Sequence, residues 1–420
     1  MYRVTQLENG LTVATAEMPH MASVSVGLWV DVGGRYESEA LNGASHFIEH
    51  LLFKGTPRRS ALQISQAVEG IGGYLNAFTS EEHTCFYAKA RHDYFGHLLE
   101  VLADMFLHST FDPVEIDKER EVIKEELAMY MDQPQQYVQE LLNATLWPGQ
   151  ALGRCITGTE KSLNALGRGQ LLDYQKRNYV APATLLAAGG RITHREAVAA
   201  AKRYARKFAR GARPRCAPAV SNQTKPALRL LTKKTEQTQI ALGFRACSRH
   251  DERRFALRLL NAVLGENMSS RLFQTVREEH GLAYSIYSSN SFFDDASDLV
   301  IAAGLDTDNL EKALRLILRE MSRLKSQRVP APELRRARDY LIGQIDLSLE
   351  NSENQMMWAG EQWLGYGKII YPDEVKKRLG EVTAGHVRAA AAEFFRPERL
   401  NLALISPLKS ASGLEKVLAA

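Results

Sequence analysis

The sequence predicts an α+β protein of two homologous domains, each a mostly antiparallel sheet packed against helices. First, its 420 residues are too many for one ordinary hydrophobic core. Second, segments in which apolar residues alternate are interleaved with segments of helical periodicity. Third, the order of these segments repeats at an offset of about 210 residues. We therefore expect a domain over residues 1–211, a linker over 212–227 and a second domain over 228–420.

The composition is that of an ordinary globular protein, with 45% apolar and 24% charged residues. A net charge of +4 gives no reason to expect nucleic acid or a membrane surface as a partner. The four cysteines are scattered and never spaced Cys-x-x-Cys, so we interpret them as reduced, mostly structural thiols. Neither a signal peptide nor an apolar run of about 18 residues is evident, so we expect a cytoplasmic protein without a membrane span.

The first segments of the chain predict strands. Asn9-Gly10 lies between two short β-type runs and indicates a hairpin turn. In residues 23–32 the apolar side chains alternate strictly, which is typical of a half-buried strand. Gly33-Gly34 ends that strand, and a helix is expected to follow.

This helix carries His46, Glu49 and His50 in the order His-x-x-Glu-His, the inverse of the commoner zinc-protease motif. Residues four apart lie on one helix face, so both imidazoles can bind the same metal ion. Two nitrogen ligands, one further ligand and a position left to water make a catalytic zinc site. Zinc lowers the pKa of that water, and Glu49 is close enough to take its proton.

The same three residues could instead form a polar helix face, and the surrounding sequence bears on this alternative. Asn42 is expected to cap the helix and Gly55 to end it. Large apolar side chains fill the remaining positions: Phe47, Ile48, Leu51, Leu52 and Phe53. Two histidines and a glutamate within such a helix are costly unless they bind something.

Residues 60–70 and 93–108 predict helices, and residues 72–90 between them predict a hairpin. Asp112-Pro113 starts a long helix. One face of that helix combines apolar residues with two carboxylates: Ile116, Glu119, Ile123, Glu126 and Tyr130. By itself this could be a surface helix. Beside the His-x-x-Glu-His motif, Glu126 becomes a candidate third metal ligand and Glu119 a supporting residue.

Further helices are predicted at 134–147, 162–179 and 194–209, followed by a proline-rich linker. The second half then repeats the strand, helix and hairpin order of the first. At the repeat offset, Ala256, Leu259 and Leu260 stand where the metal motif stands. We infer a duplication in which only the first copy kept the metal site.

Together these residues resemble the pitrilysin, insulin-degrading enzyme and mitochondrial processing peptidase family of inverzincin zinc metallopeptidases. The inverted motif matches, and so does the pair of glutamates seven apart, with Glu126 placed 76 residues after His50. The resemblance implies one zinc ion per chain, held by His46, His50 and Glu126. It also implies Glu49 as the general base and Glu119 as an assisting glutamate.

The resemblance further implies how a peptide substrate binds. Residues 75–84 resemble the family's edge strand, which takes up peptides by strand addition. The implied contacts are Leu75, Asn76, Ala77, Phe78 and Thr79. Arg277 and Tyr284 match the Arg and Tyr with which the family's non-catalytic half assists substrate binding and transition-state stabilisation. Without the family pattern, these two residues would carry no functional weight.

The resemblance covers nearly the whole chain and implies a zinc endopeptidase that hydrolyses unstructured peptides in a closed chamber. The two-domain length is similar to that of the processing-peptidase subunits and their bacterial relatives, which dimerise. A homodimer is thus implied, and a heterodimer with a related chain stays open. The alternatives are a non-catalytic scaffold or binding subunit of the same fold, and a catalytic subunit that needs a partner chain. Nitrogen and carboxylate ligands do not exclude manganese or cobalt.

Overall fold

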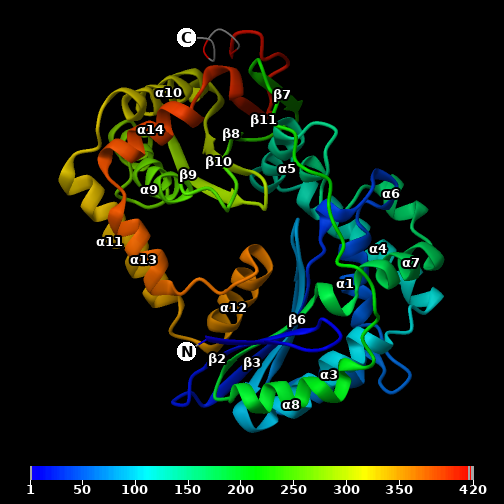
Figure 1. Ribbon diagram of the computed structural model, residues 1–420. Helices are drawn as coiled ribbons and strands as arrows, with labels where there is room; N and C mark the ends of the chain where they lie inside the picture. The colour runs from blue at the N-terminus through cyan, green and yellow to red at the C-terminus, as the bar shows by residue number, and fades with distance from the viewer. Residues whose placement is uncertain (1, 415–416, 418–420) are drawn as a thin grey trace. The chain divides into compact units, whose positions relative to one another are not determined.

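The computed structural model describes residues 2–414 and 417, so residue 1 and the outermost end of the predicted second domain lie outside the described residues. The chain forms two compact units, each built from three segments (Figure 1). The first unit comprises Met1–Ala128, Arg154–Ala217 and Leu347–Tyr371. The second comprises Met129–Gly153, Pro218–Asp346 and Pro372–Ala420. The two units therefore differ from the predicted domain bounds in two segments. Residues 129–153, from the first half of the chain, belong to the second unit, and residues 347–371, from the second half, belong to the first.

A six-stranded sheet organises the first unit, in the order β1-β2-β6-β3-β5-β4. Only β2 and β6 pair in parallel, so the sheet is mostly antiparallel as predicted. The predicted hairpin turn at Asn9-Gly10 joins β1 and β2. The strands are β1 (Tyr2–Gln6), β2 (Thr12–Glu17), β3 (Ser23–Val30), β4 (Tyr74–Thr79), β5 (Thr84–Arg91) and β6 (Thr184–Gly190).

Strand β3 is buried on both faces, which corrects the prediction of a half-buried strand. Its valine and leucine face packs into the main core of the unit. On the opposite face, Trp29 packs against Met356 and Ala359 of α12 (Ser352–Tyr366). Gly360 lies against the Trp29 ring, where a Cβ atom would have no room. The alternating pattern could not reveal this burial because α12 is contributed by a segment more than 300 residues later.

The other face of the first sheet is covered by a layer of helices that includes α1, α3 and α8. In Figure 1, α3 and α8 lie side by side along this layer. The helix predicted over 162–179 is interrupted at Gly167 and forms α6 and α7. Apart from α12, the helices of this unit are α1 (Ala44–Leu52), α2 (Ala61–Glu69), α3 (Phe95–His108), α4 (Pro113–Met131), α6 (Glu160–Ala165), α7 (Arg168–Asn178) and α8 (His194–Ala205).

The second unit repeats the topology of the first. Its five strands follow the order β7-β11-β8-β10-β9, which matches β2-β6-β3-β5-β4 position by position. The parallel pair, β7 with β11, also stands at the equivalent place. This correspondence confirms the predicted duplication. The strands are β7 (Ala227–Thr232), β8 (Thr238–Ala246), β9 (Ala283–Phe292), β10 (Ser297–Leu305) and β11 (Asn401–Ser406).

The second sheet also has a helix on each face. Leu142 and Leu146 of α5 lie over Gly243 of β8, so a segment from the first half of the chain covers this face. Phe244, the next residue of β8, points to the other face and meets Phe395. The helices of this unit are α5 (Pro134–Leu146), α9 (Arg254–Leu264), α10 (Leu310–Ser326), α11 (Ala331–Ser348), α13 (Pro372–Glu381) and α14 (Ala384–Phe394).

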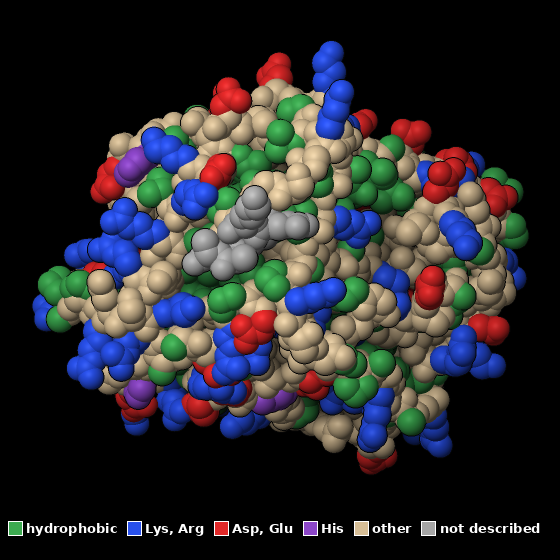
Figure 2. Space-filling view, turned by 90° about the horizontal axis from the view of Figure 1, so that it is seen from above, with side chains coloured by type: hydrophobic (Ala, Val, Ile, Leu, Met, Phe, Trp, Pro, Cys, Tyr) green, Lys and Arg blue, Asp and Glu red, His purple; other side chains and the backbone are tan. Residues whose placement is uncertain are grey.

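The surface carries charges of both signs. On the face displayed in Figure 2, Lys and Arg side chains are interspersed with Asp and Glu. Within residues 2–414 and 417, no helix has both the length and the hydropathy that crossing a bilayer requires.

Candidate metal centre

The helix that carries the metal motif is capped by a residue that sequence analysis missed. Asn42 was expected to cap α1, but the N-cap is Gly43, whose φ of +95° lies in the left-handed region. The Glu37 carboxylate instead accepts the backbone N–H groups of Gly43 and Ser45, each at 2.7 Å. Asn42 contributes its side-chain amide to the same carboxylate, at 3.3 Å. At the other end α1 stops at Leu52, three residues before the predicted Gly55.

We expect Glu37→Gln to loosen α1, because both Glu37 oxygens face donors and a side-chain amide must turn its own N–H groups toward one of them. Glu37 is 4% exposed, and an unsatisfied buried group costs about 1–3 kcal/mol. Amide hydrogen exchange over residues 43–52 should accelerate by about tenfold or more. Glu39→Gln, an exposed neighbour, is the control. Equal protection of α1 in both variants would contradict the capping role.

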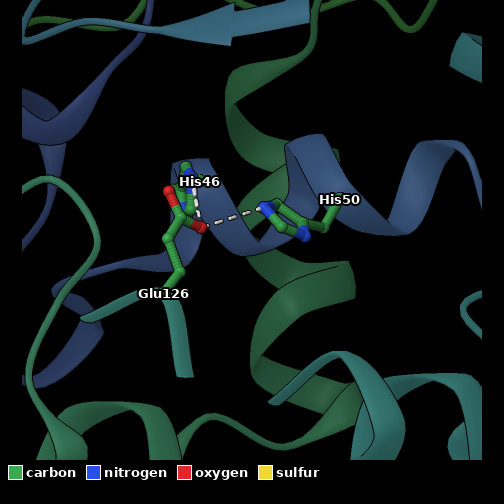
Figure 3. A group of neighbouring side chains, drawn as sticks. All are labelled: His46, His50 and Glu126. Atoms are coloured by element: carbon green, nitrogen blue, oxygen red, sulfur yellow. Dashed lines mark ion pairs between the residues drawn. The ribbon is translucent and has the colours of Figure 1, made fainter. Parts of the chain in front are cut away.

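His46, His50 and Glu126 converge as the sequence predicted (Figure 3). The two histidines extend from consecutive turns of α1, and Glu126 reaches them from α4. Glu126 Oε2 lies 3.7 Å from His46 Nε2 and 3.6 Å from His50 Nε2. One ligand atom from each residue falls within 4.8 Å of the other two. The three donors therefore face one small volume, as ligands of a single ion do.

The environment of His46 keeps its imidazole neutral. Burial, together with the neighbouring His50, lowers the pKa of His46 to about 4. Its Nδ1 atom is buried and has no hydrogen-bond partner within the described residues. A neutral imidazole is the form that binds metal ions. The two nitrogens and one carboxylate oxygen fit the donor set of a catalytic zinc site.

Glu119 contacts the ring nitrogen of His50 that does not face Glu126. Its Oε2 lies 3.0 Å from His50 Nδ1, and its Oε1 lies 2.7 Å from the Lys54 ammonium group. Burial lowers the pKa of His50, but the nearby carboxylates of Glu119, Glu126 and Glu49 outweigh this effect and raise that pKa to about 9. Burial likewise opposes ionisation of Glu119, yet His50 and Lys54 hold its pKa below the usual range. Lys54 was not predicted, although its position one helical turn after His50 was a usable signal.

We expect Glu119→Gln to weaken zinc binding by about 10–100-fold, the usual effect of removing a carboxylate that orients a metal-binding histidine. The amide still fills the space but no longer favours the Nδ1–H tautomer as strongly. A competition titration with a chromogenic chelator measures the affinity. Glu115→Gln, on the same helix and paired with exposed Lys118, should bind zinc as the wild type does. An unchanged affinity in Glu119→Gln would remove its orienting role.

Glu49 lies on α1 between the two histidines in sequence, and it is anchored by the neighbouring strand. Thr79 Oγ1 donates a hydrogen bond of 2.5 Å to Glu49 Oε2. Burial raises the pKa of Glu49, and the Thr79 hydrogen bond opposes this effect. The structure thus holds this carboxylate in one position beside the three candidate ligands.

Thr79 ends β4, which is an edge strand of the first sheet. Within the described residues, β4 pairs only with β5, so its outer edge has no strand partner. The predicted contact residues Leu75, Asn76, Ala77 and Phe78 belong to this strand. An unpaired edge is what strand addition requires, and this edge ends at the residue that anchors Glu49.

Arg277 and Tyr284 belong to the second unit and lie against each other there. Arg277 sits in a π-helical turn, Phe273–Glu279, and Tyr284 is the second residue of β9. The guanidinium carbon lies 4.6 Å from the Phe273 ring centre and 5.4 Å from the Tyr284 ring centre. Tyr284 is 79% exposed, so its phenol is available to a ligand while Arg277 holds the ring.

Comparison with known proteins gives a consistent result along the chain. Residues 12–160 match the family "Insulinase (Peptidase family M16)", and residues 165–341 match "Peptidase M16 inactive domain". An "uncharacterized zinc protease" of Bacillus subtilis (strain 168) is 37% identical, with 95% of this chain and 97% of that protein covered. The chain belongs to peptidase family M16. A second protein of that description, from Streptomyces coelicolor, is 36% identical over 97% of this chain and 90% of its own.

Solved structures support the M16 fold. A protease from Helicobacter pylori superposes with a TM-score of 0.91, at 19% identity, over 97% of this chain and 99% of that one. A protein from Pseudomonas fluorescens described as a peptidase M16 inactive domain gives 0.90 at 18% identity, over 97% and 99%. In this M16 chain, the stretch matched by the inactive-domain family contains Ala256, Leu259 and Leu260 in place of the metal motif.

Proposed function

We propose that this chain is a zinc-dependent endopeptidase that hydrolyses unstructured peptides. The observation that carries the proposal is the convergence of His46, His50 and Glu126 within 4.8 Å of one another, beside an anchored carboxylate that is not among them. The M16 membership and the names of its relatives support the same activity. We propose one zinc ion per chain.

The donors fit zinc, and bound zinc supplies a Lewis acid that lowers the pKa of water and polarises a carbonyl group. Glu49 takes a proton from the attacking water and delivers it to the leaving amine as the C–N bond breaks. Thr79 keeps the Glu49 carboxylate oriented through both transfers. The peptide lies along Leu75–Thr79 as an added strand, so its main chain is fixed relative to Glu49.

In the second half of the chain, we propose that Tyr284 donates a hydrogen bond to the developing oxyanion and that Arg277 positions it. Tyr284→Phe is expected to lower kcat by about 10-fold or more while KM changes little, because the lost bond forms chiefly in the transition state. Steady-state kinetics on a quenched peptide provide both constants. Tyr371→Phe removes another exposed phenol and serves as the control. An unchanged kcat would count against the oxyanion role.

We also propose that two chains close the reaction chamber, as a homodimer or with a related chain. A chamber with walls from two chains admits flexible peptides and excludes folded proteins. The support for this is the resemblance to short two-domain members of the family. Sedimentation velocity on the purified chain distinguishes a monomer from a dimer. A cytoplasmic location stays a prediction from the sequence.

Two alternatives remain: a non-catalytic binding subunit of the same fold, and a catalytic subunit that is silent without a partner chain. Hydrolysis of a varied pool of quenched, unstructured peptides, with and without a zinc chelator, tests all three. Cleavage that the chelator abolishes supports the self-sufficient metallopeptidase. A silent chain holding one zinc ion favours the missing partner, and a silent chain without zinc favours the binding subunit.

A further inference from the structure

A strongly basic segment lies in the first unit, outside the metal centre. Residues 191–215 contain nine Lys and Arg residues and one Glu, a net charge of +8. The rest of the chain contains 44 Lys and Arg residues against 48 Asp and Glu residues, a net charge of −4. The small net charge of the whole chain therefore conceals a pronounced local asymmetry, and large local fields attract ligands of opposite charge.

The cations of this segment are available to a ligand. Helix α8 turns Ala197 and Ala201 toward the sheet, so its lysines and arginines face away. Lys202, Arg206 and Arg210 are exposed, and none of them has a carboxylate partner within the described residues. Some other surface cations, such as Arg315 and Arg253, are paired with carboxylates. The basic segment lacks this neutralisation at the three positions.

These three cations line a groove of about 1090 Å³. The end of β1 and the turn that follows it, residues 5–9, line the same groove. The side chains of Thr5, Gln6 and Asn9 are hydrogen-bonded within the chain, and Glu8 is the single carboxylate among the lining residues. The groove therefore presents three cations against one acid.

The groove chemistry discriminates among polyanions. None of the exposed large apolar side chains in the described residues lies within 2–20 or 180–215. Leu7 and Phe208 line the groove but are buried. Sites for single-stranded nucleic acid pair cations with exposed aromatic rings, and interfacial helices insert exposed apolar residues into lipid. Both features are missing here, and a concave site does not match a flat bilayer.

We infer that this groove binds an extended, acidic polypeptide segment. Its carboxylates pair with Lys202, Arg206 and Arg210. Its main chain has partners as well, because β1 is the second edge strand of the sheet and no strand of the described part of the chain lies on its outer side. Strands β1 and β4 lie at opposite edges, five strand spacings or roughly 24 Å apart. The groove is thus separate from the strand proposed to hold the scissile bond.

The proposal rests on the proposed function only in treating the bound segment as part of a substrate. The test uses fluorescence anisotropy of a labelled oligo-glutamate of about twelve residues, long enough to span roughly 40 Å. Binding requires no turnover, so a chain that fails to cleave peptides can still pass. The triple variant Lys202→Gln, Arg206→Gln, Arg210→Gln should bind at least about tenfold more weakly than the wild type, and added salt should weaken wild-type binding.

The matched control removes three exposed cations of the second unit that also have no carboxylate partner among the residues the structure describes: Lys312→Gln, Arg335→Gln, Arg336→Gln. It should bind oligo-glutamate as the wild type does. Equal affinity of the wild type and the groove variant would overturn the proposal, and so would an equal loss in the control. A single-stranded oligonucleotide of equal charge and vesicles containing phosphatidylglycerol are the competing probes. Tighter binding of either one through the same three residues would also overturn it.

Discussion

Glu49→Gln is expected to keep its bound metal and to lose peptide hydrolysis by about 10²–10⁴-fold, the usual contribution of a general base. Glutamine has nearly the same shape and can still accept the Thr79 hydrogen bond through its carbonyl oxygen. It cannot accept a proton from water. Because Glu49 is directed at Thr79 and stands outside the His46, His50 and Glu126 group, its replacement should leave the ligands in place.

Two measurements on the same preparation check this result: hydrolysis of a quenched peptide and metal content by elemental analysis. Glu125→Gln is the control, since Glu125 precedes the proposed ligand Glu126 but is exposed on another face of α4. It should retain both metal and activity. Wild-type activity in Glu49→Gln would remove Glu49 as the base. Loss of metal together with activity would make Glu49 a ligand, which the geometry does not suggest.

The local sequence was sufficient to predict the elements that form the candidate metal centre. A spacing of four residues on a helix determines where two side chains lie, so His46 and His50 follow from the sequence directly. The mixed face of α4 likewise identified Glu126 and Glu119, because two carboxylates on an apolar stripe are costly without partners. The structure also places residues 75–79 in an edge strand, and its Thr79 contacts Glu49, the proposed general base.

Contacts between distant parts of the chain could not be predicted in this way. Glu37 caps α1 because the backbone folds back over six residues, whereas the local pattern favoured Asn42. Strand β3 appeared half-buried because nothing near it in sequence indicates that α12 covers its second face. The predicted domain bounds differ from the two units for the same reason. Helices α5 and α12 each pack on a sheet that is built mainly from the other half of the chain.

Composition misled in one respect. The whole-chain charge gave no reason to expect an electrostatic binding surface, yet residues 191–215 carry a net charge of +8. A window of this length would have found the asymmetry. Only the structure, however, shows that α8 directs its alanines inward. It also shows Lys202 of α8 and Arg206 just after it beside a groove, with no carboxylate partner in the described part of the chain.

His50→Ala is expected to weaken zinc binding by more than about 100-fold, beyond the usual effect of losing an orienting carboxylate. The variant removes one of three donors and also leaves Glu119 without its imidazole partner. Zinc at 100 times its Kd should stabilise the wild type by about 2.7 kcal/mol. At the same zinc concentration that stabilisation should fall to about 0.4 kcal/mol or less in the variant, and the rise in Tm should shrink accordingly.

His20→Ala, which removes an exposed histidine, should keep both the zinc affinity and the zinc-dependent rise in Tm. An unchanged affinity in His50→Ala would place the metal elsewhere in the chain. Both readings are obtained without substrate, so they separate the existence of the site from the activity. A chain that binds zinc through His50 and cleaves nothing would favour a peptidase that lacks a partner chain. A binding subunit does not require a third ligand, an orienting carboxylate and an anchored base around the same ion.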